Sequence, residues 1–511
     1  VKRGSSWAMI CCVQPFPWKA PVNAGSQVHP KEPPDMPIPV APAAVAVLLS
    51  AAAPQNPLLA PWTGPFGGVP PFDQVKVEQF EPALEAAMAA QLAAIDRITA
   101  EPAATFENTL AALERSDRLL DQVAGVYGVW SSSMNTPEFQ AVETEMAPRL
   151  AAFRDRITQN QKLFERVAAV YEAREKAGLT PEQQRLAWLH YTDFVRAGAK
   201  LSPGAKERLS AINQRLASLF TKFSQNLLAD ENDSVLFLEG ERDLVGLPDS
   251  FRSAAAAAAE ARGKKGQWAV LNTRSSVEPF LAYSGRRDLR EKAWRAFVNR
   301  GDNGDATDNN LLVAEILALR AERAKLLGYE THAHWRLENS MARTPDRAVG
   351  LLEAVWTPAV ARVREEVADM QAIADAEGAG LKIAPWDYRY YAEKVRKAKY
   401  DLDSDVLKQY LQLDKLREAM FFVAGEVFDF RFTPVPASKV AVYHPDVKVW
   451  EVTRKSTGKP VGLWYLDPYA RPGKRSGAWA SSYRGHATFD GKQTVLSSNN
   501  SNFIEPAEGE A

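Results

Sequence analysis

The first half of this chain is organised by apolar residues at helical spacing, which requires several amphipathic helices around shared cores. One stripe consists of Phe80, Leu84, Met88, Leu92, Ile95 and Ile98, and another of Leu209, Ile212, Leu216, Phe220, Phe223 and Leu227. Pairs such as Thr180-Pro181 and Ser202-Pro203 place a capping residue before a proline, as at a helix start. Core packing explains such stripes better than a cofactor groove, so a mainly α fold is predicted.

The pattern changes to strands near the C-terminus. We expect a hairpin of strands 449–453 and 461–465, turned through 456–459, and a last short strand at 494–498. No helical pattern follows these strands, so one face of this small sheet is expected to be uncovered. Apolar surface over 449–495 would then stay exposed.

Composition limits the class of protein. The 511 residues include 62 Lys+Arg and 63 Asp+Glu, a balance that argues against nucleic acid or an anionic membrane surface as the partner. The two cysteines, Cys11 and Cys12, are adjacent, which excludes a disulfide framework in the body of the protein. The length predicts more than one domain. We expect a leader over 1–61, a helical region over 62–275 and a second region over 276–511.

The leader has two interpretations. Its apolar run at 40–53 is too short to cross a bilayer. Starting from Met36, the segment 36–53 resembles the apolar core of a signal peptide with small residues for cleavage, which would make the protein periplasmic or exported. However, no Lys or Arg lies between Met36 and Val40, and Pro42 interrupts the run. The alternative is a disordered leader on a cytoplasmic protein.

The common catalytic motifs are missing from the 511 residues. There is no His-Glu-x-x-His, and no two of the six histidines lie four apart, the spacing that puts two zinc ligands on one helix face. His332 and His334 are two apart and point to different faces. The segment 401–412 begins like a calcium loop, but Val406 and Gln412 stand where glycine and glutamate are needed. The basic loop 471–475 fits either a substrate carboxylate or a turn salt-bridged to its neighbours.

Three stretches are recognisable. They are Thr-Phe-Glu-Asn-Thr-Leu at 105–110, Pro-Trp-Asp-Tyr-Arg-Tyr-Tyr-Ala-Glu-Lys at 385–394, and Trp-Tyr-Leu-Asp at 464–467 followed by Lys-Arg-Ser-Gly-Ala-Trp at 474–479. Together they resemble the thimet oligopeptidase family of zinc metallopeptidases, in particular its bacterial peptidyl-dipeptidase branch. The resemblance covers residues 56–511.

The resemblance implies a mainly α, zincin-type peptidase scaffold with a deep channel and zinc on its floor. Two histidines of His-Glu-x-x-His and a later glutamate hold the metal, and the glutamate within the motif activates water. Short unstructured peptides would lose C-terminal dipeptides, and the protein would be a monomer without nucleic-acid or membrane partners. In the family this motif follows the segment that matches 497–506. No catalytic or metal residue can therefore be transferred, and we expect a truncated catalytic portion, no bound zinc and no activity for the 511 residues.

A scaffold role can be transferred. The strand over 494–502 resembles the edge strand that pairs with the substrate backbone in zincin-type peptidases, which predicts Ser498 and Asn500 near the substrate path. Alternatively, these residues only cap the sheet. Two rival explanations remain: a non-catalytic helical peptide-binding or interaction protein that has lost the site, and a break in the gene model.

Overall fold

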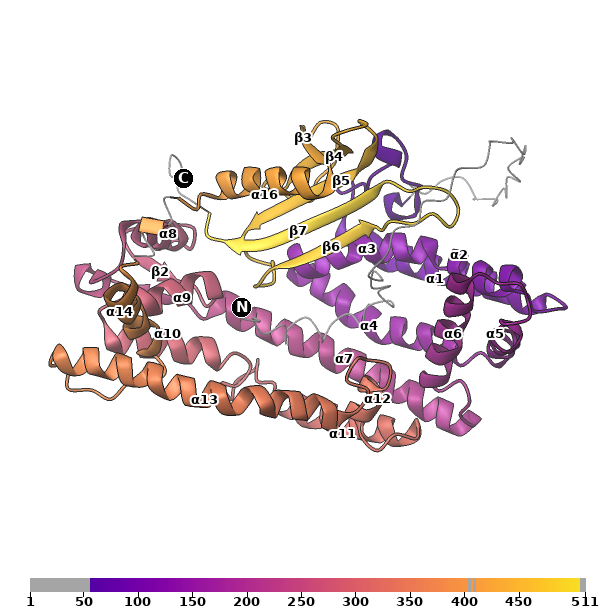
Figure 1. The fold of residues 1–511 in the computed structure, drawn as a ribbon, viewed down its shortest axis with the longest axis horizontal. Coiled ribbons are helices and arrows are strands. Elements are labelled where there is room, and N and C mark those ends of the chain that lie inside the picture. Colours follow the sequence, from indigo (N-terminus) through magenta and orange to yellow (C-terminus); the bar gives the residue numbers. More distant parts are fainter. Residues whose placement is uncertain (1–55, 403–405, 408–409, 506–511) are drawn as a thin grey trace.

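The computed structural model describes residues 56–402, 406–407 and 410–505; the expected signal segment 36–53 lies outside them. The described chain is mostly helical and carries a small mixed sheet built from its C-terminal part (Figure 1). This confirms the predicted mainly α scaffold with a small β-sheet near the C-terminus.

The N-terminal region consists of helices whose apolar stripes are buried in several hydrophobic cores, as predicted. Phe80, Leu84 and Ile95 of the first stripe are almost completely buried. Thr180 caps its helix through a reciprocal pair of hydrogen bonds with Gln183, which confirms the predicted start. The helices are α1 (Phe80–Ala100), α2 (Ala112–Ser116), α3 (Arg118–Ser133), α4 (Pro137–Thr158), α5 (Gln161–Ala173), α6 (Pro181–Arg196) and α7 (Pro203–Asp233).

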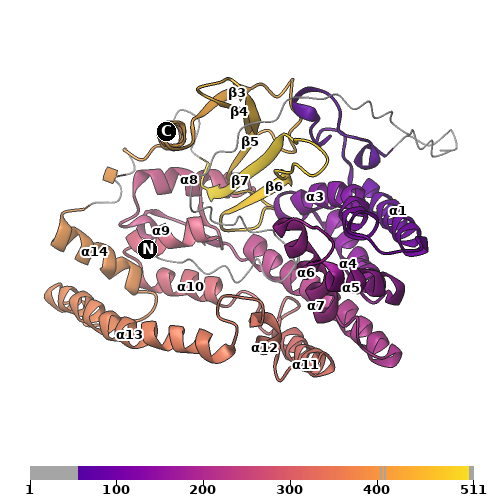
Figure 2. The same ribbon diagram turned by 45° about the vertical axis from the view of Figure 1, so that its right-hand side comes forward.

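The middle of the chain forms a second helical group (Figure 2). A two-stranded antiparallel sheet, β1 (Leu236–Leu238) with β2 (Trp268–Val270), packs with neighbouring helices around Phe280. The helices are α8 (Asp249–Glu260), α9 (Arg274–Tyr283), α10 (Arg287–Val298), α11 (Asn310–Leu326), α12 (His332–Leu337), α13 (Pro345–Ala376) and α14 (Tyr388–Tyr400).

The family-like stretch 385–394 ties α14 to α10. Asp387, fully buried, receives hydrogen bonds from Arg287 (Nη2 to Oδ2, 2.9 Å) and Arg290 (Nη2 to Oδ1, 2.8 Å). Arg290 is itself 2% exposed, so each buried charge is compensated by the other. This part of the resemblance therefore marks a structural contact between two helices about 100 residues apart in sequence.

The C-terminal sheet has the strand order β3-β4-β5-β7-β6. The predicted hairpin is confirmed as β4 and β5, which pair antiparallel. β7 runs parallel to β5 and antiparallel to β6. The elements are α16 (Leu413–Phe428), β3 (Phe430–Val435), β4 (Lys448–Arg454), β5 (Pro460–Tyr469), β6 (Trp479–Arg484) and β7 (Val495–Phe503).

Both faces of this sheet have helical neighbours, so the expectation of an uncovered face is wrong. On one face, Tyr443, Tyr465 and Tyr483 surround Phe72 in a core shared with α1 and α3. On the other, Phe421 of α16 stacks on Phe432, with ring centroids 4.1 Å apart. The cover comes from the N-terminal helices and from the helix just before β3.

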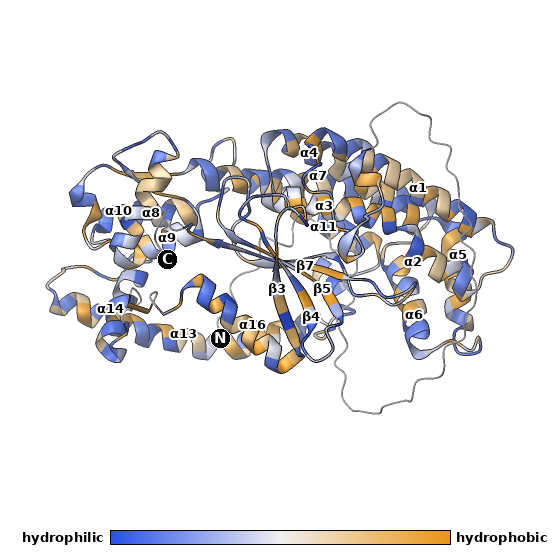
Figure 3. Ribbon diagram, turned by 90° about the horizontal axis from the view of Figure 1, so that it is seen from above, coloured by the Kyte–Doolittle hydropathy of each residue, from blue (hydrophilic) through white to orange (hydrophobic). Residues whose placement is uncertain are grey.

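The exposed apolar side chains lie mainly on helices rather than on 449–495, where Leu463 and Tyr465 are buried. Figure 3 shows hydrophobic residues along α13 and α16. Among the described residues, no helix combines the length and hydropathy that crossing a bilayer requires. The exposed set comprises Val349, Leu351, Leu352, Val355, Trp356 and Val363 on α13, and Leu416, Met420, Phe422, Val423, Val427 and Phe428 on α16.

Candidate functional site

The strand expected at the sheet edge is an interior strand. β7 is hydrogen-bonded to β5 on one side and to β6 on the other, so its backbone has no free edge in this structure. The edge strand next to it is β6. The edge-strand prediction for 494–502 is therefore wrong, and an added strand would have to pair with β6 instead.

The basic loop 470–478 joins β5 to β6, and β7 pairs between these two strands. This loop binds the C-terminal end of α3, where backbone carbonyls have no helical partner. Arg475 donates from Nε to the Ser131 carbonyl at 3.0 Å and from its backbone N–H to the Ser132 carbonyl at 2.9 Å. Arg471 donates from Nη2 to the Ser133 carbonyl at 3.1 Å. Cations are favourable at a helix C-terminus, so these bonds fix the loop against the end of α3.

Glycine is required at position 473, where the loop contacts the connection between α3 and α4. Gly473 accepts a hydrogen bond from the backbone N–H of Asn135 at 2.9 Å and has φ +77°. A Cβ at Gly473 would lie 2.8 Å from the Asn135 carbonyl oxygen. Of the two interpretations of this loop, the structure supports a turn bonded to its neighbours, although much of it is buried rather than solvated.

Beneath the loop lies a buried carboxylate, Asp467 on β5. It accepts hydrogen bonds from Arg471 (Nη1, 2.7 Å), Lys474 (Nζ, 2.8 Å) and the Tyr443 hydroxyl (2.9 Å). Burial alone would raise the pKa of Asp467, but the hydrogen bonds from Arg471 and Lys474 outweigh it and hold the pKa below the ordinary value. The carboxylate is therefore ionised at neutral pH.

Lys474 is the buried cation of this cluster. Its Nζ donates to Oδ1 of Asp467 (2.8 Å), to the Asp467 carbonyl (3.0 Å) and to the Tyr469 carbonyl (2.7 Å). Burial lowers the pKa of Lys474 to about 8, although the bond to Asp467 opposes the shift. Three acceptors match the three N–H donors of an ammonium group, which favours the charged form at neutral pH.

Ser498 and Asn500 lie beside this cluster, on the face of β7 turned toward the helical core. Asn500 donates from Nδ2 to Ser498 Oγ at 3.1 Å and accepts from the Tyr443 hydroxyl at 3.2 Å. Both side chains are buried. Because strand residues alternate between faces, Asn499 points the other way and accepts a hydrogen bond from Trp464 Nε1 at 2.7 Å.

The sequence interpretation missed Tyr443, Asp467 and Lys474 as one cluster. Asp467 and Lys474 lie within the family-like stretches, but nothing local shows that their charges are buried together. Their contacts depend on a strand pairing and on α3, more than 300 residues earlier in the chain.

The metal chemistry of the described residues is limited. Among them, no three His, Cys, Asp or Glu side chains are grouped so that they could hold an ion. His332 packs against Trp335, with ring centroids 5.5 Å apart, and His334 shares a hydrogen bond with the Thr331 hydroxyl. These residues do not fit a zinc centre, so no step through a metal is derived from them.

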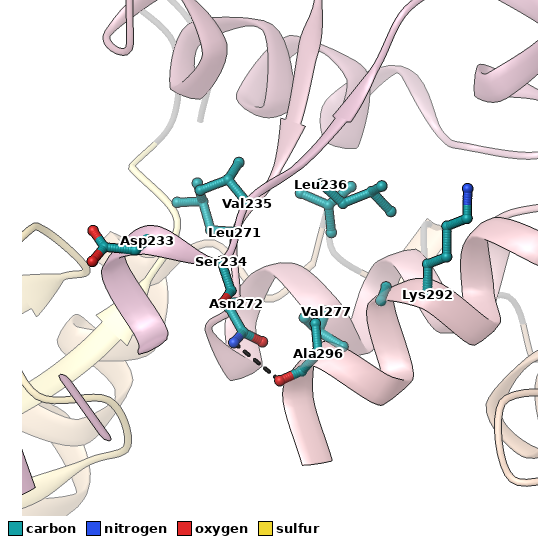
Figure 4. Close-up of a pocket in the computed structure, with 11 residues that line it drawn as sticks. Asp233, Ser234, Val235, Leu236, Leu271, Asn272, Val277, Lys292 and Ala296 are labelled. Atoms are coloured by element: carbon teal, nitrogen blue, oxygen red, sulfur yellow. Dashed lines mark hydrogen bonds between the residues drawn. The ribbon is translucent and has the colours of Figure 1, made fainter. Parts of the chain in front are cut away.

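A cavity of about 290 Å³ opens between the β1–β2 pair and the helices α9 and α10 (Figure 4). Its wall is mostly aliphatic, with Asn272 donating from Nδ2 to the Ala296 carbonyl at 3.2 Å. Asp233 and Lys292 lie apart along this wall (Figure 4). The cavity offers no pair of groups suited to acid–base or nucleophilic chemistry.

Comparison with known proteins places these features in a family. The model of Peptidase family M3 matches residues 280–510. The chain is 34% identical over 457 residues to "Dipeptidyl carboxypeptidase" of Escherichia coli (strain K12), covering 89% of this chain and 66% of that protein. It is 35% identical over 457 residues to the protein of that name from Salmonella typhimurium, again covering 89% and 66%.

A second group of relatives carries another name. The chain is 30% identical over 429 residues to "Oligopeptidase A" of Salmonella typhimurium, covering 83% of this chain and 62% of that protein. The chain thus spans less than two thirds of the length of the curated relatives described.

Proposed function

Because the chain belongs to peptidase family M3, the thimet oligopeptidase family with its bacterial peptidyl-dipeptidase branch, we propose that it binds short unstructured peptides, the class from which enzymes of this branch release C-terminal dipeptides. The observation that carries the peptide-binding part of this proposal is the position of β6 at the edge of the sheet. An extended peptide that pairs with β6 would add one strand by β-augmentation.

The side chains of β6 suit this mode of binding. Ala480 and Ser482 are small and exposed, so they leave room for another backbone to approach. Tyr483 points into the core, where its ring lies 5.2 Å from that of Tyr465. A peptide added here would meet backbone groups rather than a bulky exposed side chain.

β6 is also held rigidly, which reduces the entropy lost on binding. Arg484 donates from Nε to the Thr494 carbonyl at 2.7 Å and from Nη1 to the Gly67 carbonyl at 2.8 Å. Asn502 of β7 donates from Nδ2 to the Gly477 carbonyl at 2.7 Å, just before β6. The edge is therefore fixed from both ends before any peptide arrives.

For Ser498 and Asn500 a part in peptide recognition remains a prediction. Since both side chains are buried, we propose that they act on the peptide indirectly, by fixing β7 against Tyr443 and Asp467 and so fixing β6. Their substitution should then change β6 and peptide affinity together.

The family is generally zinc-dependent, whereas the described residues contain no fitting ligand group. We therefore propose that the 511 residues bind peptides without zinc-dependent cleavage, the behaviour of a non-catalytic peptide-binding protein. If these 511 residues bound one zinc ion per chain and cleaved peptides, the proposed absence of zinc-dependent cleavage would be wrong. That result would leave the proposed pairing of peptides with β6 untested and intact.

The test of the β6 edge uses backbone-methylated peptides and fluorescence anisotropy. In a paired strand, only every second N–H faces its partner. Methylating one alternate set of peptide nitrogens should weaken binding to the 511-residue chain by about tenfold or more, because each lost hydrogen bond costs about 1 kcal/mol. Methylating the other set, the matched control, should have little effect. Equal effects of both sets would refute pairing with a strand edge.

A further inference from the structure

Four arginines converge where α6, α11 and α12 meet, around Trp335 of α12. The guanidinium carbons of Arg323, Arg336 and Arg196 lie 4.7, 5.6 and 5.9 Å from the centre of the Trp335 ring. Arg320 is the fourth, one helical turn before Arg323 on α11. α12 lies beside α11 in both ribbon views (Figures 1 and 2).

Most of this positive charge has no carboxylate partner. Arg196 forms an ion pair with Glu338. Among residues 56–402, 406–407 and 410–505, Arg320, Arg323 and Arg336 have no carboxylate within 4.0 Å. Arg323 is only 7% exposed and donates one hydrogen bond, from Nη1 to Asn213 Oδ1 at 3.1 Å. A buried charge without a counter-charge is costly, so the cluster favours binding an anion.

Buried polar atoms without a partner support the same conclusion. In the described structure, Nε of Arg320, Nε of Arg323 and Nδ1 of His332 are buried and have no hydrogen-bond partner. Burial and then the proximity of Arg323, Arg320 and Arg336 lower the pKa of His332 to about 4. Burial, followed by the charges of Arg320 and Arg336, also lowers the pKa of Arg323 to about 10.

The nearby acids are engaged elsewhere. Asp155 accepts a hydrogen bond from Asn213 Nδ2 at 2.9 Å, and Glu338 is bound by Arg196 and by the Tyr329 hydroxyl. Asp193 lines the adjoining cavity and is near Arg196. These carboxylates offset part of the charge, but Arg320, Arg323 and Arg336 form no ion pair with any of them.

A cavity adjoins the cluster at Arg336 and Trp335. It measures about 290 Å³ and is lined by polar and aromatic groups that include Arg196, Arg336 and Trp335. A water molecule occupies about 30 Å³ in the liquid, so a small oxyanion with part of its hydration shell fits. Arg336 belongs to both the cavity wall and the cation cluster, and so connects them.

We propose that Arg320, Arg323 and Arg336 form a binding site for a small phosphate-type oxyanion, reached through the cavity beside Trp335. The planar guanidinium group can donate two parallel hydrogen bonds to such an anion. The site is separate from the β6 edge and does not depend on the proposed peptidase function. Inorganic phosphate and the phosphate group of a small metabolite share the required chemistry.

Calorimetric titration of the 511-residue chain with inorganic phosphate at constant ionic strength tests the proposal. We expect saturable binding of one phosphate per chain, and Arg320→Gln and Arg336→Gln should each weaken it by about tenfold, as expected for a lost hydrogen bond to a charged group. Arg323→Gln should weaken it at least as much if circular dichroism shows the variant folded. A second titration with glycerol phosphate distinguishes the two possible ligands. Tighter binding than that of inorganic phosphate indicates a phosphorylated metabolite, and weaker binding indicates the free ion.

The matched control is Arg215→Gln. Arg215 on α7 pairs with Glu315 on α11 through hydrogen bonds of 2.6 and 2.7 Å, so the change removes the same charge from a helix that packs against α11, outside the cluster. It should leave phosphate affinity unchanged. Absence of saturable binding, equal weakening in Arg215→Gln, or equal affinity for acetate and phosphate would overturn the proposed site.

Discussion

Replacing Asp467 by asparagine should destabilise the C-terminal sheet more than any surface charge change. The substitution keeps the size of the side chain but removes the charge that neutralises Arg471 and Lys474. Lys474 keeps two backbone carbonyls as acceptors, and Arg471 keeps the Ser133 carbonyl. Neither contact supplies a negative charge, so two cations become uncompensated in a buried place.

The expected loss follows from burial. Asp467 is 0% exposed and Lys474 is 4% exposed. Removing one partner of a buried ion pair typically costs about 3–5 kcal/mol in free energy of unfolding. Total stabilities are about 5–15 kcal/mol, so Asp467→Asn should leave the sheet only marginally stable.

Urea denaturation followed by tryptophan fluorescence measures this loss, and hydrogen exchange locates it. The amides of β7 and of residues 131–135 should lose protection together, because the loop above Asp467 binds the end of α3. Lys474→Met in the Asp467→Asn background should cost less than the sum of the single changes, with a coupling of about 0.5–3 kcal/mol. Asp490→Asn is the control, since Asp490 pairs with Arg115 and Arg118 at the surface.

The same pair predicts a dependence on pH. The pKa of Asp467 is lower in the folded protein than in the unfolded chain, so its contribution is complete above the unfolded value of about 4 and disappears as pH falls through the folded value. Asp467→Asn should remove this part of the acid sensitivity. A loss below about 1 kcal/mol, with wild-type protection at residues 131–135, would refute the role assigned to the cluster.

Two further predictions test other contacts. Gly462→Ala should separate β5 from β7, because the new Cβ would lie 2.2 Å from the Val495 carbonyl oxygen; we expect a loss of about 1–3 kcal/mol, measured by urea denaturation. Gly125→Ala in α3, where a Cβ would meet nothing within 4 Å, should instead be neutral or stabilising. His332, whose pKa is lowered to about 4, binds a proton more readily when unfolded, so stability should fall as pH drops from 6.5 to 4. His332→Gln should flatten that part of the stability curve, and an unchanged curve would contradict the burial of His332 among the arginines.

The helical part of the fold could be predicted because its signal is local. The stripe from Phe80 to Ile98 and the start at Thr180-Pro181 depend on residues within a few turns of each other. The hairpin of β4 and β5 could be predicted equally well, since both strands and their turn are adjacent in sequence. Such patterns fix the elements but not what covers them.

Contacts between residues distant in sequence decide which elements cover the sheet and which strand lies at its edge. Nothing near β7 in the sequence shows that β6 lies outside it, because the order is set by pairing between strands that are separated along the chain. The alternation along β7 could have shown that Ser498 and Asn500 share one face. Only the packing of Tyr443 and Asp467 shows that this face is buried.

The loop 470–478 therefore links the two halves of the molecule. Its cations satisfy carbonyls that α3 leaves free, and its buried lysine neutralises Asp467. It also connects β5 to β6, which lies one strand beyond β7. A change at the end of α3 would then move the strand edge proposed to bind peptides, although the two lie more than 300 residues apart in sequence. The Lys-Arg-Ser-Gly-Ala-Trp stretch therefore makes structural contacts, and it belongs to no group of residues that could hold a metal ion in the described part of the chain.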